Sequence, residues 1–131
     1  FTRYIQKSNI ELNVAREMVN KQILPAAIEY CGVLAKANYY GEKVGILNGV
    51  TVKSQRVISE LADEIDALCE TLIKNHKEAM EMPTQEQQAN ALYEVCSKDL
   101  PALREKVDYL ETVMPKDKWP MPTYTDLFFD L

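Results

Sequence analysis

One apolar stripe constrains the fold of this 131-residue chain more than any other feature. Between about residue 51 and residue 82, apolar side chains recur at alternating steps of three and four. They are Ile58, Leu61, Ile65, Leu68 and Leu72. This spacing gathers them on one face of an α-helix, as in the seam of a helical bundle, while charged residues occupy the opposite face. The stripe therefore predicts a long amphipathic helix whose apolar face must be covered by partner helices.

A second stripe precedes it, over residues 4–40, and contains Ile5, Leu12, Val19 and Ala26. This spacing is also helical. Pro25 lies inside the pattern and predicts a bend, because proline cannot donate the backbone hydrogen bond that its position requires. Glycines at 41, 45 and 49 then mark an unusually apolar connection, so the helix is expected to end near Tyr40.

A third stripe follows Pro83, which stops the second helix. Thr84 and Gln87 form the signature of a capping box, and a helix is expected from there to Met114. Asp99 and Pro101 predict a kink or a short break, with Asp99 as a cap for a new helical start. The stripe consists of Ala89, Leu92, Cys96, Leu100, Leu103, Val107, Leu110 and Met114.

Three helices joined by short connections predict an all-α fold, an elongated antiparallel three-helix bundle with kinked helices and an extended C-terminal tail. The bundle is expected over residues 1–114 and the tail over residues 115–131. Pro120 and Pro122 prevent a helix from starting in the tail. Its apolar side chains predict a docking element that fills a groove, either on the bundle or on neighbouring protein. These docking residues are Trp119, Met121, Tyr124, Leu127, Phe128, Phe129 and Leu131.

Charge and hydropathy exclude several classes of partner. Acidic residues outnumber basic ones by 20 to 15, for a formal charge of −5, so no nucleic-acid partner is expected. The longest apolar run, residues 23–28, is too short for a membrane span, so no membrane partner is expected. Cys31, Cys69 and Cys96 read as buried free thiols, which predicts a reducing, cytoplasmic location.

No residue of the chain is predicted to act in catalysis, cofactor binding or metal binding. His76 lies among apolar helical neighbours, and Ile73 occupies the position where a carboxylate-bridged metal site needs a glutamate. His76 is expected to pack at the edge of the core, with a histidine phosphotransfer bundle as a weaker alternative. The carboxylates of Glu60, Asp63, Glu64 and Asp66 are expected to form a solvated helix face rather than a cation site.

Two short motifs carry a resemblance to a known family. "WPMPTYTDLFFDL" at the end of the chain and "NKQILPAAIEY" at residues 20–30 resemble the C-terminal region of type III glutamine synthetases. The likeness extends over essentially the whole chain, from the proline-containing helix to the ending rich in aromatic residues.

The resemblance implies a parent enzyme that joins ammonia to glutamate with ATP, through a γ-glutamyl phosphate, as a large homo-oligomer with divalent Mg or Mn ions. It also implies that the motifs for metal, nucleotide and glutamate precede this region, so that no cofactor is bound by this fragment. The expected partners are the rest of its own chain and neighbouring subunits. A start at Phe1 rather than Met agrees with a piece of a longer protein. The alternative is a free-standing acidic helical module that binds a partner protein.

Overall fold

The computed structural model describes residues 1–121. Over this range it is all-α and contains no strand, which confirms the predicted fold class. The elements in order are α1 (Thr2–Met18), the π-helical turn η1 (Val19–Ile23), α2 (Leu24–Lys43), α3 (Gly49–Met80), α4 (Gln85–Glu94), the π-helical turn η2 (Val95–Asp99), α5 (Leu100–Val113) and the 3₁₀ turn η3 (Lys116–Lys118).

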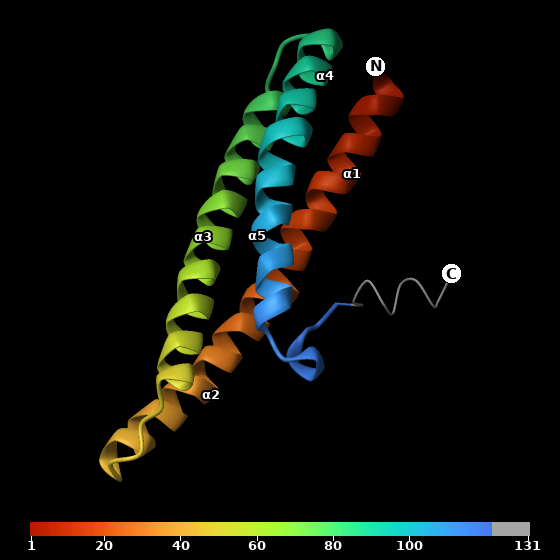
Figure 1. The fold of residues 1–131 in the computed structure, drawn as a ribbon. Helices are drawn as coiled ribbons and strands as arrows, with labels where there is room; N and C mark the ends of the chain where they lie inside the picture. The colour runs from red at the N-terminus through yellow and green to blue at the C-terminus, as the bar shows by residue number, and fades with distance from the viewer. Residues whose placement is uncertain (122–131) are drawn as a thin grey trace.

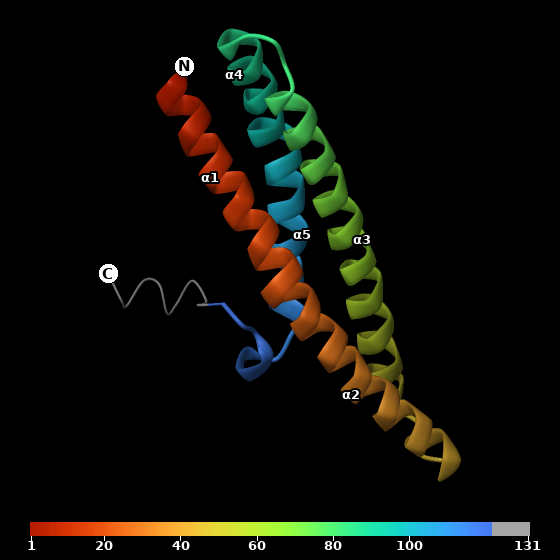
Figure 2. The ribbon, with the colours of Figure 1, turned by 180° about the vertical axis from the view of Figure 1, so that it is seen from behind.

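These elements form three long rods (Figure 1). The first rod is α1, η1 and α2, the second is α3, and the third is α4, η2 and α5. The first and third run in the same direction, and α3 returns between them in sequence (Figures 1 and 2). The first rod crosses the other two, because α1 packs on α4 whereas α2 packs on α3. Its course therefore leads away from α5, which packs on α3.

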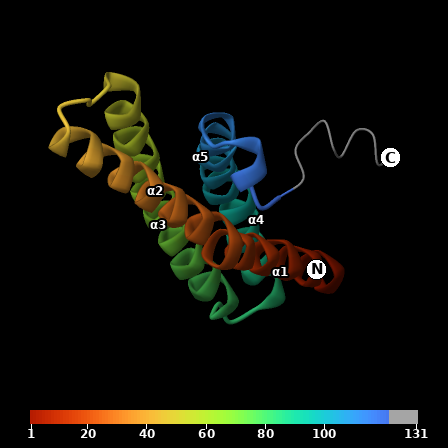
Figure 3. The same ribbon diagram turned by 90° about the horizontal axis from the view of Figure 1, so that it is seen from below.

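The far ends of α2 and α3 continue beyond the end of α5 as a two-helix arm (Figures 1 and 3). The turn at its tip depends on two glycines. Gly45 has a φ of +72°, which glycine adopts without the strain of a side chain. At Gly41 the chain returns so closely that an added Cβ would lie 2.5 Å from the Ile46 carbonyl oxygen. Asn48 then caps α3 by accepting a hydrogen bond from the Thr51 amide, so the helix begins at Gly49, slightly earlier than predicted.

The two prolines inside the rods each follow a π-helical turn. The sequence predicts a bend at Pro25 and a kink or a short break at Pro101, but not these turns. Pro25 and Pro101 lie in the first turn of α2 and α5, after η1 and η2. Each rod continues through its proline as helix. The prediction that Asp99 caps a new helical start is wrong, because its side chain makes no cap hydrogen bond. The Asp99 carboxylate instead accepts a hydrogen bond from Asn75 Nδ2 at 2.9 Å, which joins the third rod to α3.

The predicted cap at Thr84 is confirmed. Its hydroxyl oxygen accepts a hydrogen bond from the Gln87 amide at 3.1 Å, and the hydroxyl donates to Gln87 Oε1 at 3.2 Å. The core lies along the inner faces of the three rods. Its most deeply buried large side chains are Leu12, Ile23, Ile58, Ile65, Leu72, Leu92, Leu103 and Leu110.

Candidate docking surfaces

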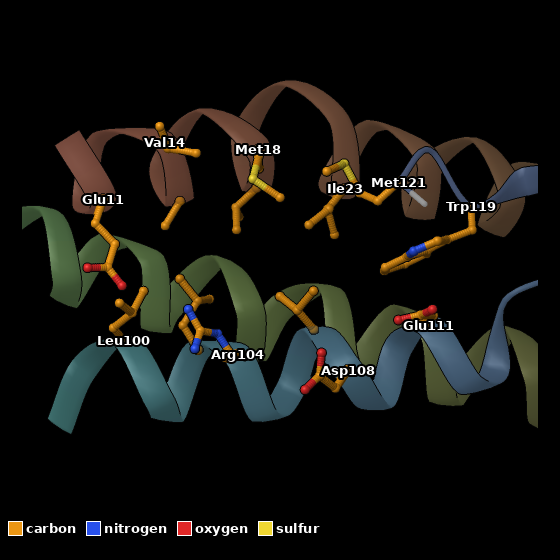
Figure 4. A pocket seen from close by; sticks show the side chains of 14 residues that line it. Glu11, Val14, Met18, Ile23, Leu100, Arg104, Asp108, Glu111, Trp119 and Met121 are labelled. Carbon is orange, nitrogen blue, oxygen red and sulfur yellow. The ribbon is translucent and has the colours of Figure 1, made fainter. Parts of the chain in front are cut away.

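An apolar groove lies between the first rod and α5 (Figure 4). The first rod packs on α4 at its start and on α3 at its end, while α5 stays packed on α3. The first rod and α5 are therefore not in full contact along their facing surfaces. The cavity has a volume of about 550 Å³. The first rod contributes Glu11, Val14, Ala15, Met18, Val19 and Ile23, and α5 contributes Leu100, Leu103, Arg104, Val107, Asp108 and Glu111. Trp119 and Met121 complete the lining.

The chain itself enters this groove after α5 ends. Met114 and Pro115 are extended, and the short turn η3 reverses the chain, with the Trp119 amide donating to the Lys116 carbonyl at 3.3 Å. Trp119 is only 9% exposed and belongs to the hydrophobic core, and Met121 packs against that core. The indole lies across the mouth of the groove, near Met121 and Ile23 (Figure 4).

Two of the seven predicted docking residues are thus placed on one surface. Trp119 and Met121 both line the groove. The other five, Tyr124, Leu127, Phe128, Phe129 and Leu131, lie outside the described residues. The docking role of the tail stays a prediction.

Charged side chains form the rim of the groove. Glu11 belongs to α1, and Arg104, Asp108 and Glu111 belong to α5. Burial raises the pKa of the Glu111 carboxyl, and the nearby Asp108 carboxylate raises it further. Arg104 is the one base among the described lining residues. An occupant must therefore present an apolar face to the floor and tolerate an acidic rim.

The second candidate surface is the tip of the two-helix arm, which we call the arm surface. It consists of Tyr39, Tyr40, Val44, Ile46, Leu47 and Val50, and each of these side chains is about half exposed or more. Val50 and Ile46 are the most open, at 75% and 74%. The apolar letters of residues 44–47 indicated an unusual loop, but the sequence did not reveal that the two tyrosines and Val50 extend the same exposed end.

The arm below this surface is held together by polar contacts. Asn38 Nδ2 donates to Gln55 Oε1 at 2.6 Å and to the Thr51 carbonyl at 3.3 Å, so it ties α2 to α3. The ring of Tyr40 meets that of Tyr39 edge to face, with centroids 5.3 Å apart, and the Lys43 ammonium lies 5.2 Å from the Tyr39 centroid. These contacts give the arm surface a defined shape while its apolar atoms remain exposed to solvent.

His76 is packed at the edge of the core, as predicted. It is half-buried, and its Nε2 donates to Asn9 Oδ1 at 2.7 Å, which connects α3 to α1. Burial lowers the pKa of His76, and the positive charge of Arg16 lowers it further. The neutral imidazole is thereby favoured, and its hydrogen bond to Asn9 links the second rod to the first.

The three cysteines are free thiols, with Cys69 buried and Cys31 and Cys96 half-buried. Burial is the main cause that raises the pKa of each thiol, so each remains protonated and a weak nucleophile. Within residues 1–121 no group of three or more His, Cys, Asp or Glu side chains is arranged to hold a metal ion.

The acidic face of α3 is exposed at all four predicted positions, Glu60, Asp63, Glu64 and Asp66. Glu64 forms an ion pair with Lys106 of α5 at 2.8 Å. Both partners are substantially exposed, so this pair contributes little to stability. None of the described helices combines the length and the apolar composition that a membrane crossing requires.

The fold and these two surfaces define the class of the chain: a helical domain with an apolar groove and an exposed apolar end. Two comparisons with known proteins then point to a particular family. Residues 1–41 match the family model for the glutamine synthetase C-terminal domain. Over 97% of its length the chain is 24% identical to a glutamine synthetase of Bacteroides fragilis (strain YCH46). The chain spans 18% of the length of that relative. No solved structure matches it.

These matches confirm the resemblance to glutamine synthetase, and residues 1–41 carry the likeness to the C-terminal domain of that family. The matched region includes α1, η1 and most of α2, and therefore also the proline-containing motif at residues 20–30. The assignment to the type III class stays a prediction.

Proposed function

We propose that this chain is the C-terminal helical domain of a glutamine synthetase, and that it supports the catalytic body or the assembly of subunits without contributing active-site residues. The parent enzyme would ligate ammonia to glutamate at the expense of ATP. The family matches support the parentage. The observation that carries the supporting role is the arm surface, where six exposed large apolar side chains lie within residues 39–50.

Exposed apolar groups concentrated at one end favour an interface. Single exposed apolar side chains are normal, but a contiguous group marks a binding surface in most folded proteins. Covering one large apolar side chain completely is worth about 1.5 to 3 kcal/mol. Tyr39 and Leu47 are about half exposed, and Ile46 and Val50 are more open, so each would contribute part of this free energy when covered. In the proposed assembly this surface packs against the rest of its own chain or a neighbouring subunit of a homo-oligomer.

The described residues do not fit the nucleotide and metal of such an enzyme. Mg²⁺ and Mn²⁺ prefer several oxygen ligands that converge, and residues 1–121 contain no converging set. The groove has an apolar floor and an acidic rim, which opposes a triphosphate. ATP and the divalent ions are therefore assigned, in this proposal, to parts of the parent outside this chain.

The test compares variants of the parent polypeptide, encoded from upstream of Phe1. Ile46→Asp places a charge at the centre of the arm surface, and Ile10→Asp is the matched control, an isoleucine 65% exposed on α1. We expect Ile46→Asp to dissociate subunits or lower ligase activity by about tenfold or more, the effect of about 1.4 kcal/mol on an interface, while Ile10→Asp leaves both unchanged. Sedimentation velocity and glutamine formation provide the measurements.

Three results would overturn the proposal. Ile46→Asp could leave assembly and activity unchanged in the parent. The purified 131-residue chain could form glutamine by itself. Finally, the reading frame could begin close to Phe1 without glutamine synthetase motifs, which would instead support the free-standing interaction module.

A further inference from the structure

We propose that residues 122–131 bind in cis along the groove between the first rod and α5, as a direct continuation of Trp119 and Met121. This inference concerns how the chain covers its own apolar surface, and it holds whether or not the parent is a glutamine synthetase. It selects one of the two alternatives that the sequence left open, docking on the bundle rather than on neighbouring protein.

The chain leads directly from the described residues into the segment 122–131. Trp119 is the last described residue that is buried, and Met121 is the last described residue that lines the groove. Pro122 follows immediately, so the next segment starts at the groove and needs no linker to reach it. Along the first rod, the lining extends from Glu11 to Ile23, which is about 18 Å at 1.5 Å per residue. A ten-residue extended segment reaches about 33 Å and can cover this distance.

The composition of the segment is complementary to the lining of the groove. The floor of the groove is formed by apolar side chains, and Val14, at the end far from Trp119, is 51% exposed. The segment 122–131 contains Tyr124, Leu127, Phe128, Phe129 and Leu131, which are the residues that such a floor accepts. A cavity of about 550 Å³ lies within the range of about 300 to 1,000 Å³ that encloses ligands the size of a few side chains.

The electrostatic terms oppose one another and are smaller than the apolar term. The segment contains Asp126 and Asp130, the rim of the groove carries three carboxylates, and Arg104 offers one ion-pair partner. Solvent-exposed charge pairs contribute about 0 to 1 kcal/mol each, whereas one fully buried large apolar side chain contributes about 1.5 to 3 kcal/mol. Two buried aromatic rings therefore outweigh the repulsion from the rim.

Covalent attachment favours the chain's own segment over a second copy. A short connection gives the segment an effective concentration near the groove of about 1 mM or more. The segment of another molecule reaches an equal concentration only when the protein itself is at about that level. The proposal therefore predicts a docked state that does not depend on protein concentration.

The experiment uses Trp119, the single tryptophan of the chain, as a reporter inside the groove. The 131-residue chain is compared with a chain ending at Met121 and with the double variant Phe128→Ser, Phe129→Ser. We expect both variants to expose Trp119 to acrylamide quenching and to shift its emission to longer wavelength. Hydrogen exchange of α5 amides is expected to accelerate by about tenfold, the factor for a docking equilibrium constant of about ten.

A matched pair of substitutions tests the groove side. Val14→Asp puts a charge into the groove, and Ile10→Asp puts the same charge one turn earlier on α1, outside the groove lining. Val14→Asp should reproduce the effect of truncation on Trp119 quenching, and Ile10→Asp should not. Thermal melting of both variants verifies that the bundle remains folded.

Two outcomes would overturn the inference. If truncation at Met121 changes neither Trp119 quenching nor the exchange of α5, the segment does not occupy the groove. If the protection of Trp119 rises with protein concentration and sedimentation detects dimers, the occupant is the tail of a second copy and the cis arrangement is wrong.

Discussion

Trp119→Ala should destabilise the bundle although the residue lies beyond the last long helix. The indole is only 9% exposed, and it packs at one end of the groove between the first rod and α5. A buried aromatic side chain covers about 150 to 250 Å², which at about 25 cal/mol per Å² corresponds to about 4 to 6 kcal/mol as an upper bound. Because the open groove lets neighbouring side chains and water fill part of the space, we expect a loss of about 3 kcal/mol.

Urea unfolding followed by far-ultraviolet circular dichroism measures this change. Tyr109→Ala is the matched control, because Tyr109 is an aromatic residue of α5 that is 53% exposed. We expect the control to lose less than about 1 kcal/mol, and Trp119→Phe to recover about half of the loss at Trp119. A loss at Trp119 no larger than that of the control would refute the reasoning, since it would mean that the start of the tail contributes no burial to the fold.

Three further predictions follow from single positions. Gly41→Ala should destabilise the arm by about 1 to 3 kcal/mol, because the new Cβ meets the Ile46 carbonyl. Gly32→Ala, on the open side of the same helix, should stabilise the fold by about 0.5 to 1 kcal/mol, and thermal melting compares the two variants. The pKa of His76 is lowered in the folded chain, so the contribution of its neutral imidazole to stability is present above the unfolded pKa of 6.5 and is lost as the pH falls. In urea unfolding, His76→Gln should therefore lose less stability than the unsubstituted chain between about pH 7.5 and about pH 5. Thr84→Ala should cost about 1 kcal/mol in urea unfolding, and Thr84→Asn should restore most of it, since both Thr and Asn cap helices.

The sequence predicted the three rods because their stripes are long and regular. Ile58, Leu61, Ile65 and Leu72 are all buried, as the spacing of the stripe between residues 51 and 82 required, and Leu68 is partly buried. The capping signature at Thr84 located the start of the third rod, because a cap depends on local hydrogen bonds that the sequence displays directly.

The burial of single residues at the π-helical turns could not be predicted in the same way, although Leu100, Leu103, Leu110 and Met114, the stripe positions beyond η2, are buried as predicted. A π turn holds one more residue than an α turn, so the residues that follow it are rotated by about 100° about the helix axis relative to a regular α-helix. In the third rod Val95 is buried and Cys96 only half-buried, although the stripe assigned the core position to Cys96. In the first rod, Ile23 and Ala27 are buried and Ala26 is partly exposed for the same reason. Spacing rules assume a constant period, and these two turns change it.

The candidate docking surfaces were predictable only in part, because they depend on how the rods diverge. The amino-acid sequence shows directly that the tail and the connector are apolar. The groove depends on tertiary packing, because it arises only where the first rod passes from α4 to α3 and leaves α5. Crossing of this kind is a property of three packed helices together and has no local signature. The sequence could therefore name Trp119 and Met121 as docking residues without identifying the surface that receives them.

The two π-helical turns contribute to the apolar lining of the groove. Turn η1 supplies Val19 and Ile23 at the end of the lining that starts at Glu11, and η2 leads directly into Leu100 and Leu103. A π turn shifts the residues that follow it by about 100° around the helix axis, and in this chain Val19, Ile23, Leu100 and Leu103 are all buried. The rods therefore turn an apolar face toward each other where they no longer touch, and an apolar face without a partner is unfavourable in water. Since α5 ends while α2 and α3 continue, the chain that leaves α5 is the nearest apolar material, and Trp119 is the first residue after the turn large enough to cover the gap.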